Sequence, residues 1–243
     1  MIRILIKSFI LYSLLTTFLF SETISQIEVN GNKRISEESV IVFSELKTGM
    51  NFNDSIINNS LFKDLLTLSK IEAQSSEMPK EGLPIYPIVT ECIDKQRQRA
   101  EARGIGFQVM VPENLRVYAN RDAMIHIVGN LVENAVKYNR DDGLVTVRAE
   151  RRQEPNKVLL EVIDLGIGMA PSHLERIFER FFRVDKGRTQ KVGGTGLGLS
   201  IVKRLVDRME AKIEVRSRVN RGSIFRLWLE PEQEYSAGNY ATE

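Results

Sequence analysis

Apolar residues recur along this chain at two spacings, one typical of helices and one typical of strands. Spacings of three and four positions predict amphipathic helices over 88–102, 123–138 and 197–209, and a short one over 171–178. Apolar runs bounded by turn residues predict strands over 107–111, 115–119, 145–151, 158–164, 213–217 and 223–229. Helices interleaved with a mostly antiparallel sheet indicate an α/β two-layer sandwich over residues 84–230.

The first 21 residues carry a different pattern. Arg3 and Lys7 precede an uncharged apolar run from Ser8 to Phe20, and the small residue Ser21 follows it. This layout predicts a secretory signal peptide. A short membrane anchor is the alternative, although the run is shorter than the ~20 residues that a span needs. Both interpretations send the following residues out of the cytoplasm.

Residues 22–62 contain a short strand, an NGNKR turn and two helical segments, the second beginning at Asp54. The wording IEVNGNKRIS and LKTGMNFND resembles the first part of a POTRA domain, the polypeptide-binding repeat of outer-membrane assembly factors. That family completes its sheet with two further strands, which do not follow here. An undifferentiated extension is the alternative, because ~40 residues with an unfinished sheet are near the limit of independent folding.

Composition and charge narrow the function classes. Lys and Arg number 34 against 32 Asp and Glu, and the net charge of +2 provides no basic field for gripping nucleic acid. The single cysteine, Cys92, cannot form an internal disulfide, and with two histidines a Cys/His metal site is excluded. We expect Cys92 in the core, and any metal must be held by oxygen ligands.

The helix predicted over 123–138 carries a row of polar residues opposite its apolar stripe. Asn130, Asn134 and Lys137 lie at i, i+4 and i+7, and therefore on one face. An amide oxygen is a suitable ligand for Mg²⁺, which shares its shell with water and phosphates, and a lysine can contact those phosphates. A solvated helix face is the alternative.

Two later segments have the chemistry of a nucleotide site. An apolar strand ends in Asp164, whose carboxylate can accept the amino group of adenine, and Gly166 and Gly168 let the backbone approach a flat base. Further on, GGTGLGLS leads directly into a helix, where free N–H groups favour phosphate. Phe178, Phe181 and Phe182 precede this loop and are interpreted mainly as core residues.

The order and wording of four segments, NLVENAVKYN, DLGIGM, RIFERFFRVD and GGTGLGLS, resemble the N, G1, F and G2 boxes of the GHKL ATPase superfamily and, within it, sensor histidine kinases. The resemblance implies that ATP and Mg²⁺ are the cofactors. It implies that Asn134 binds Mg²⁺, with Asn130 beside it near the phosphates, while Lys137 contacts phosphate and Tyr138 the ribose or base. Other branches have a general-base Glu at the position of Asn130, so unaided ATP hydrolysis should be slow.

The same resemblance implies roles for the remaining boxes. Asp164, Gly166 and Gly168 would hold the adenine, and Arg183 would contact the γ-phosphate. The last box would form the hinge and phosphate cradle through Gly194, Thr195, Gly196, Leu197 and Gly198.

The phosphoryl acceptor is the point at which the sequence departs from the family. DLLTLSKIEA resembles the end of the second helix of a dimerisation hairpin, so we assign 63–78 to a remnant of it, an ordinary amphipathic helix being the alternative. His126 and His173 both lie outside such a hairpin. We therefore expect no autophosphorylation in cis, with a histidine-bearing hairpin in trans and a response regulator as partners.

The two ends of the chain predict different compartments. Residues 1–63 carry four Lys and two Arg, whereas residues 64–243 carry nine Lys and nineteen Arg. A kinase needs ATP, so residues 64–243 are expected in the cytoplasm and membrane-associated through the N-terminal segment. An export signal at residues 1–21 conflicts with this location. The conflict suggests a fusion of unrelated coding fragments. Besides a kinase, a nucleotide-binding regulatory module without phosphotransfer and a fragment of an outer-membrane assembly factor stay open. Residues 231–243 are expected to be disordered.

Overall fold

A computed structural model describes residues 60–73, 78–184 and 195–232 of the chain. The chain divides into two compact units, Met1–Lys63 and Asp64–Glu243, and the fold described below belongs to the second. The signal or anchor predicted over 1–21, nearly all of the POTRA-like segment and residues 233–243 lie outside the described residues. No helix within the described residues is long and apolar enough to cross a membrane.

The centre of the second unit is a five-stranded sheet with the order β2-β4-β5-β7-β6. β2 pairs with β4 in parallel, and the other pairs are antiparallel. The strands are β2 (Gly106–Met110), β4 (Leu144–Arg152), β5 (Lys157–Asp164), β6 (Lys212–Arg218) and β7 (Gly222–Leu229). The predicted mostly antiparallel sheet is confirmed.

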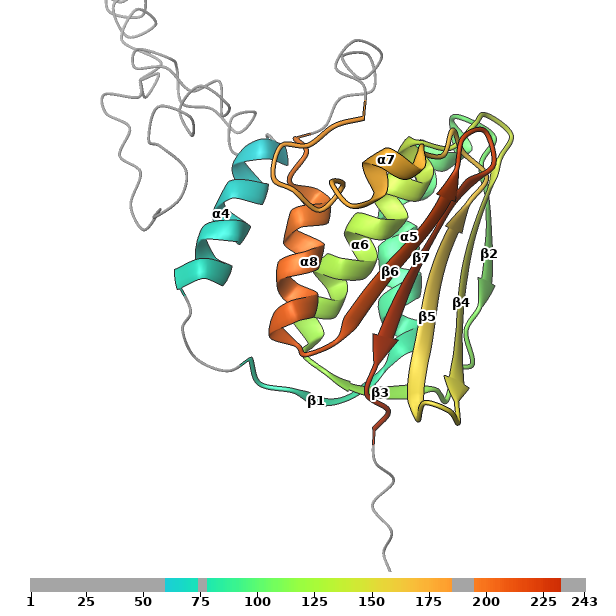
Figure 1. Cartoon of the computed structure of the whole chain (residues 1–243). Coiled ribbons are helices and arrows are strands. Elements are labelled where there is room, and N and C mark those ends of the chain that lie inside the picture. Colours follow the sequence, from blue (N-terminus) through green and yellow to red (C-terminus); the bar gives the residue numbers. More distant parts are fainter. Residues whose placement is uncertain (1–59, 74–77, 185–194, 233–243) are drawn as a thin grey trace, which may run out of the picture. The chain divides into compact units, whose positions relative to one another are not determined.

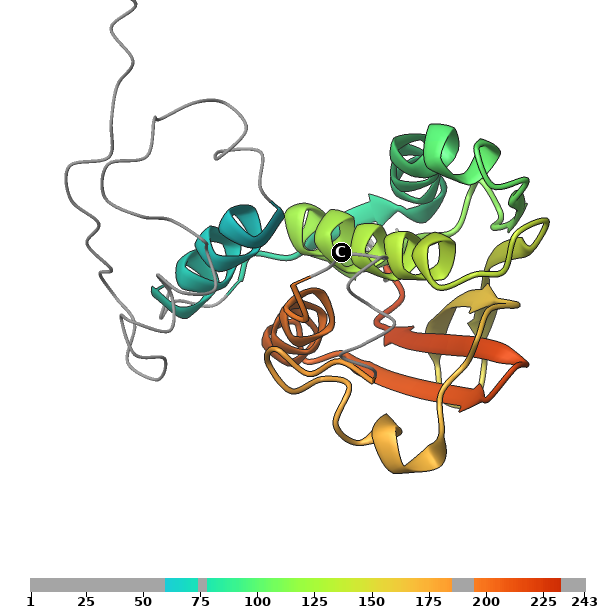
Figure 2. The same ribbon diagram turned by 90° about the horizontal axis from the view of Figure 1, so that it is seen from above.

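Three helices cover one face of this sheet, as Figures 1 and 2 show. They are α5 (Ile85–Glu101), α6 (Arg121–Lys137) and α8 (Gly198–Arg208), with α6 between the other two. The short α7 (Pro171–Leu174) lies at one end, and α4 (Ser60–Ala73) contributes the buried Leu68 and Ile71. The predicted two-layer α/β architecture is therefore confirmed.

The periodicity of α6 explains its place at the centre of the helical layer. Its predicted apolar stripe is buried at Met124, Ile127, Leu131 and Ala135. The helix begins where the Asn120 side chain accepts a hydrogen bond from the Ala123 N–H at 3.0 Å, as an N-cap should.

A small second sheet was not predicted. β3 (Arg116–Ala119), foreseen as a strand, pairs with β1 (Glu81–Pro84), a four-residue segment too short to show alternation. α5 begins at Ile85, earlier than expected, because proline is tolerated at its N-cap and in its first turn. Pro231 bridges to Val117, so the ordered fold continues beyond the predicted end at residue 230.

The predicted helix over 171–178 is shorter than expected. α7 ends at Leu174, and turns continue through Phe181, whose φ of 61° is in the left-handed region. The residues that follow this turn, Phe182, Arg183 and Val184, line the cavity described below.

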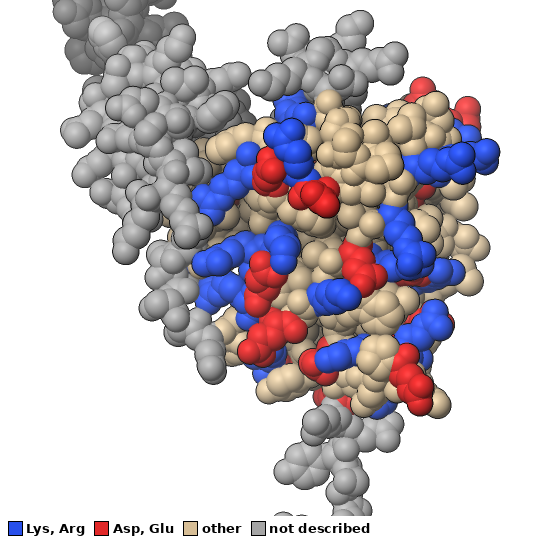
Figure 3. Space-filling model, in the orientation of Figure 1, with Lys and Arg blue, Asp and Glu red and all other residues tan. Residues whose placement is uncertain are grey.

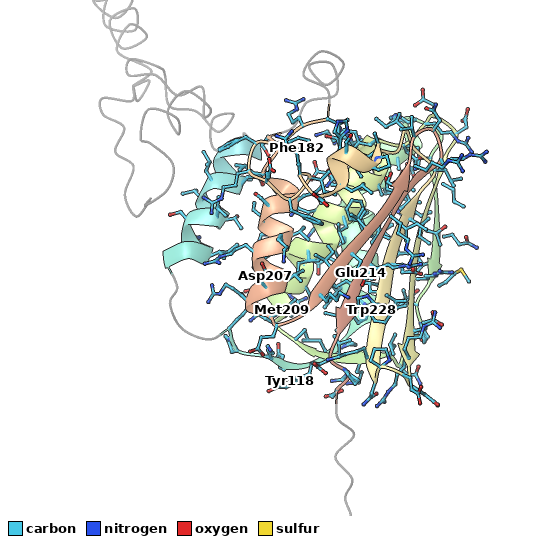
Figure 4. The ribbon with its side chains drawn as sticks, in the orientation of Figure 1. Tyr118, Phe182, Asp207, Met209, Glu214 and Trp228 are labelled. Atoms are coloured by element: carbon cyan, nitrogen blue, oxygen red, sulfur yellow. The ribbon has the colours of Figure 1, made fainter. Side chains whose placement is uncertain are left out.

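The sheet face opposite the helices carries charged residues. Glu161 is 1% exposed and accepts hydrogen bonds from Arg148 and, at 2.8 Å, from Arg226. Figure 4 shows Glu214 and Trp228 on the neighbouring strands β6 and β7. On the face seen in Figure 3, positive and negative side chains are interspersed, in keeping with the small net charge.

Candidate nucleotide site

A cavity of about 300 Å³ opens beside the end of β5. It lies among α6, the loop after β5, the segment after α7, the first turn of α8 and β7. Its lining residues are Asn134, Tyr138, Asp164, Ile167, Gly168, Met169, Ile177, Phe182, Arg183, Val184, Leu199, Ser223 and Phe225. A largely apolar wall with a few polar groups is typical of a small-molecule site.

Asp164 is the buried charge of this cavity and is 6% exposed. Burial raises the pKa of its carboxyl to about 6, although hydrogen bonds from the Gly166 N–H, at 2.8 Å, and from Ser223 oppose the shift. At neutral pH the group is therefore an acceptor-only carboxylate that has already lost most of its water.

The loop after Asp164 is held by the neighbouring backbone. The Ile167 N–H donates to the Tyr138 carbonyl at 3.1 Å, and a Cβ at Gly166 would lie 2.1 Å from that same carbonyl oxygen. At Gly168, with φ +60°, a Cβ would lie 2.0 Å from the Arg218 carbonyl oxygen. Close approach to protein backbone therefore already requires glycine at both positions, apart from any contact with a base.

The three residues of the predicted polar row on α6 have different surroundings. Asn134 lines the cavity, together with Tyr138. Asn130 donates from Nδ2 to the His126 carbonyl at 2.8 Å, and its Oδ1 lies 2.5 Å from where a Cβ on Gly198 would stand. Asn130 therefore packs against the start of α8 outside the cavity lining.

Lys137 is 9% exposed, which argues against the alternative of a solvated helix face. Its Nζ lies 5.2 Å from the centroid of the Tyr138 ring. Burial lowers the pKa of the ammonium, Glu133 opposes this shift, and Arg99 and Arg183 add to it. A partly desolvated cation next to the cavity wall is suited to an anionic group.

Arg183 and Phe182 line the cavity from the segment after α7, and Figure 4 labels Phe182 there. This segment is joined to the glycine-rich one, because the Phe181 N–H donates to the Gly196 carbonyl at 3.0 Å. Gly196 has φ +72°, and a Cβ there would lie 2.9 Å from Phe181 backbone atoms. The F and G2 segments therefore form one unit.

Thr195 connects the start of α8 to α4. Its Oγ1 accepts from the Leu197 N–H at 3.1 Å and donates to the Asp64 carboxylate at 2.7 Å. Burial raises the pKa of Asp64, and the Thr195 hydrogen bond opposes that shift. Thr195, Gly196, Leu197 and Gly198 lie next to the cavity but not in its lining, and Gly194 lies outside the described residues.

Sequence reasoning missed most of the apolar wall. The missed lining residues are Ile167, Met169, Ile177, Val184, Leu199, Ser223 and Phe225. Phe182 had been interpreted mainly as a core residue, and Ser223 only as part of a closing strand. The hydrophobic pattern carries no signal that separates a cavity wall from a core.

Neither histidine belongs to the cavity lining. His126 is exposed on α6, and the His173 ring on α7 is 6.0 Å from the Phe182 ring, centroid to centroid. Among the described residues no group of three or more His, Cys, Asp or Glu side chains could hold a metal ion. A metal at this cavity would need ligands beyond those side chains.

Residues 119–233, which include every lining residue of the cavity, match the family of histidine kinase-, DNA gyrase B- and HSP90-like ATPases. This part of the chain is the ATP-binding catalytic domain found in sensor histidine kinases.

Among curated relatives, the chain is 36% identical over 166 residues to the sensor-like histidine kinase SenX3 of Mycobacterium tuberculosis, a match that covers 68% of this chain and 40% of SenX3. Among solved structures, it resembles the mycobacterial sensor histidine kinase MprB, with 26% identity, a TM-score of 0.55, and 63% of this chain and 99% of that one covered. The structure of full-length ShkA in complex with AMPPNP is 25% identical, with a TM-score of 0.61, and the match covers 78% of this chain and 41% of that one.

Proposed function

We propose that the cavity holds Mg·ATP with its adenine at Asp164. The observation that carries this proposal is a buried carboxylate in a mostly apolar cavity, because such a group pairs with an amino donor on a flat ring. Gly168 would face the base and Tyr138 the ribose or base. The complex of ShkA, a relative in structure, with AMPPNP supports an adenine nucleotide as the ligand.

The phosphates would extend from the base toward α6 and the glycine-rich segment. Among the described residues, Lys137 and Arg183 are cations that would face the phosphates, since Arg183 lines the cavity and interacts with Lys137. Asn130 and Thr195–Gly198 would also contact the phosphates. Asn134 would give its amide oxygen to Mg²⁺, whose other ligands would be phosphate oxygens and water. Bound Mg²⁺ would neutralise charge on the transferring phosphoryl group.

The reaction we propose is transfer of the γ-phosphoryl group to a histidine other than His126 and His173. Neither of these two lies in the cavity lining, where an acceptor would have to stand in line with the γ-phosphate. The acceptor would be on a dimerisation hairpin supplied in trans, and a response regulator would take the phosphoryl group next. We place this activity in the compartment that holds ATP.

The test is a titration of the full chain with a fluorescent ATP analogue, with and without Mg²⁺. We expect saturable binding that Mg²⁺ strengthens, and its loss in Asp164→Asn but not in the exposed control Asp94→Asn. No binding by the wild-type chain would refute the proposal.

A phosphotransfer assay then separates the two nucleotide functions. The chain is incubated with radiolabelled ATP, alone and with an intact hairpin from a related kinase. We expect acid-labile label on the hairpin only. Label on the chain alone would contradict the requirement for an acceptor in trans, whereas binding without any transfer would favour the regulatory module.

A further inference from the structure

Arg103 makes an unusual set of hydrogen bonds for a residue outside the four boxes. It follows the C-cap of α5, and its side chain is 30% exposed. Its guanidinium donates from Nη1 to the carbonyls of Val136, at 2.8 Å, and Lys137, at 3.3 Å, and from Nη2 to the carbonyl of Asn139 at 2.7 Å. Asp141 holds the remaining Nε at 2.8 Å.

The last carbonyls of a helix have no intrahelical partner. Here the Val136 carbonyl also accepts the Asn139 N–H at 3.4 Å, so the guanidinium matters most for the carbonyls of Lys137 and Asn139. The one carbonyl that Arg103 omits, that of Tyr138, accepts the Ile167 N–H at 3.1 Å. The three consecutive carbonyls from Lys137 to Asn139 are thereby satisfied by a guanidinium and by the loop after Asp164, and the guanidinium adds a second donor to the Val136 carbonyl. A cation is also favoured at the negative end of a helix.

The residues fixed in this way belong to the nucleotide site. Lys137 and Tyr138 lie within the span that the guanidinium bridges, and Ile167 lines the cavity through the loop that also holds Asp164. A planar fork with donors in fixed directions can reach three carbonyls at once, whereas a lysine ammonium on a flexible stem cannot replace it.

We propose that Arg103 is a positioning residue for the nucleotide, which fixes the end of α6 and, through the Tyr138 carbonyl, the adenine-side loop. The proposal rests on the proposed function for its effect on binding. Its effect on the backbone is independent of any ligand.

The first measurement is amide hydrogen exchange by NMR on the unliganded full chain. In Arg103→Ala we expect exchange of the Ile167 amide to become about tenfold faster. The Gly106 amide, bonded to the Gly143 carbonyl at 3.0 Å without help from the guanidinium, should stay unchanged. A general loosening would accelerate both amides, and unchanged exchange at Ile167 would overturn the proposal.

The second measurement is the affinity of the same chains for the fluorescent ATP analogue with Mg²⁺. We expect about tenfold weaker binding in Arg103→Ala and little recovery in Arg103→Lys. The matched control is Arg116→Ala, which removes another arginine bonded to a carboxylate and to a backbone carbonyl, in the small sheet away from the cavity. Full recovery by lysine, or equal weakening in the control, would overturn the proposal.

A wild-type chain that binds no nucleotide would refute the proposed function. The exchange measurement would still test the positioning of the α6 end.

Discussion

The carboxylate of Asp164 should lower the stability of the unliganded protein at neutral pH, and Asp164→Asn should relieve this effect. The group is 6% exposed, and burial raises the pKa of its carboxyl from 3.8 to about 6. An asparagine keeps an oxygen that can accept from the Gly166 N–H, so the substitution mainly removes the charge.

The sign follows from the direction of the shift. Because the pKa is higher in the folded than in the unfolded state, the folded form binds the extra proton between these two values. The stabilisation is fully present below pH 3.8 and is lost as the pH rises through about 6. At 1.36 kcal/mol per unit, a shift of roughly two units corresponds to about 3 kcal/mol at pH 7.

The assay is urea unfolding of the full-length wild-type and Asp164→Asn chains at pH 4, 5, 6 and 7, followed by the fluorescence of Trp228, the single tryptophan. The stability gained by the substitution should grow by about 2 kcal/mol between pH 4 and pH 7. In Asp94→Asn, which changes only an exposed ion pair, the difference should stay within about 1 kcal/mol at every pH.

A pH-independent difference between wild type and Asp164→Asn would refute the reasoning, whatever its size. The same holds for an asparagine variant that loses stability relative to wild type as the pH rises. With the Mg·ATP analogue present the order should reverse at pH 7, because only the wild-type carboxylate accepts the adenine amino group and ligand binding stabilises the folded state.

Three further perturbations give results of different sign. Gly166→Ala should destabilise the fold by about 1–3 kcal/mol in urea unfolding, because its Cβ would lie 2.1 Å from the Tyr138 carbonyl oxygen. Gly129→Ala should instead stabilise α6 by about 0.8 kcal/mol, because the nearest atom to its Cβ would be the Cys92 sulfur at 3.8 Å. Equal effects of the two substitutions would contradict this reasoning from contacts. Glu161→Gln should cost about 1–2 kcal/mol at pH 7, and the difference should close as the pH falls through the pKa of the carboxyl, which two arginines lower below 4.5 despite burial; a difference that does not change with pH would count against an ionic origin. The Cys92 thiol, whose pKa burial raises to about 11, should not react with a thiol reagent at pH 8 until urea unfolds the chain; rapid reaction of the folded chain would show that it is accessible.

The sequence predicted those parts of the fold that depend on local pattern. The stripe of Met124, Ile127 and Leu131 is buried as its spacing required, and Asp164 ends a strand in a buried position. Both results follow from the spacing of apolar and polar residues within one segment, because that spacing determines which side chains face the core and which face water.

The parts that were missed depend on contacts between distant segments. Lys137 is 9% exposed in the last turn of α6, with its Nζ 5.2 Å from the Tyr138 ring centroid. A helical pattern contains no information about what packs around the end of the helix. Asn130 packs against the start of α8 because Gly198 has no side chain and leaves room for the amide. β1 was not predicted because its four residues, which include Gly82 and Pro84, show no alternation of apolar and polar positions.

Two buried carboxylates on one strand show how the fold separates stability from binding. Glu161 and Asp164 are both on β5, on opposite faces of the sheet, and both are almost fully buried. Two guanidinium groups compensate Glu161 within the protein, whereas Asp164 receives, from the part of the chain that the structure describes, the neutral donors of Gly166 and Ser223. Asp164 has therefore lost most of its water before a ligand arrives. An amino group that pairs with this carboxylate gains a hydrogen bond at little cost of removing water from the acceptor. The burial that lowers the stability of the unliganded fold therefore also preorganises the site for its ligand.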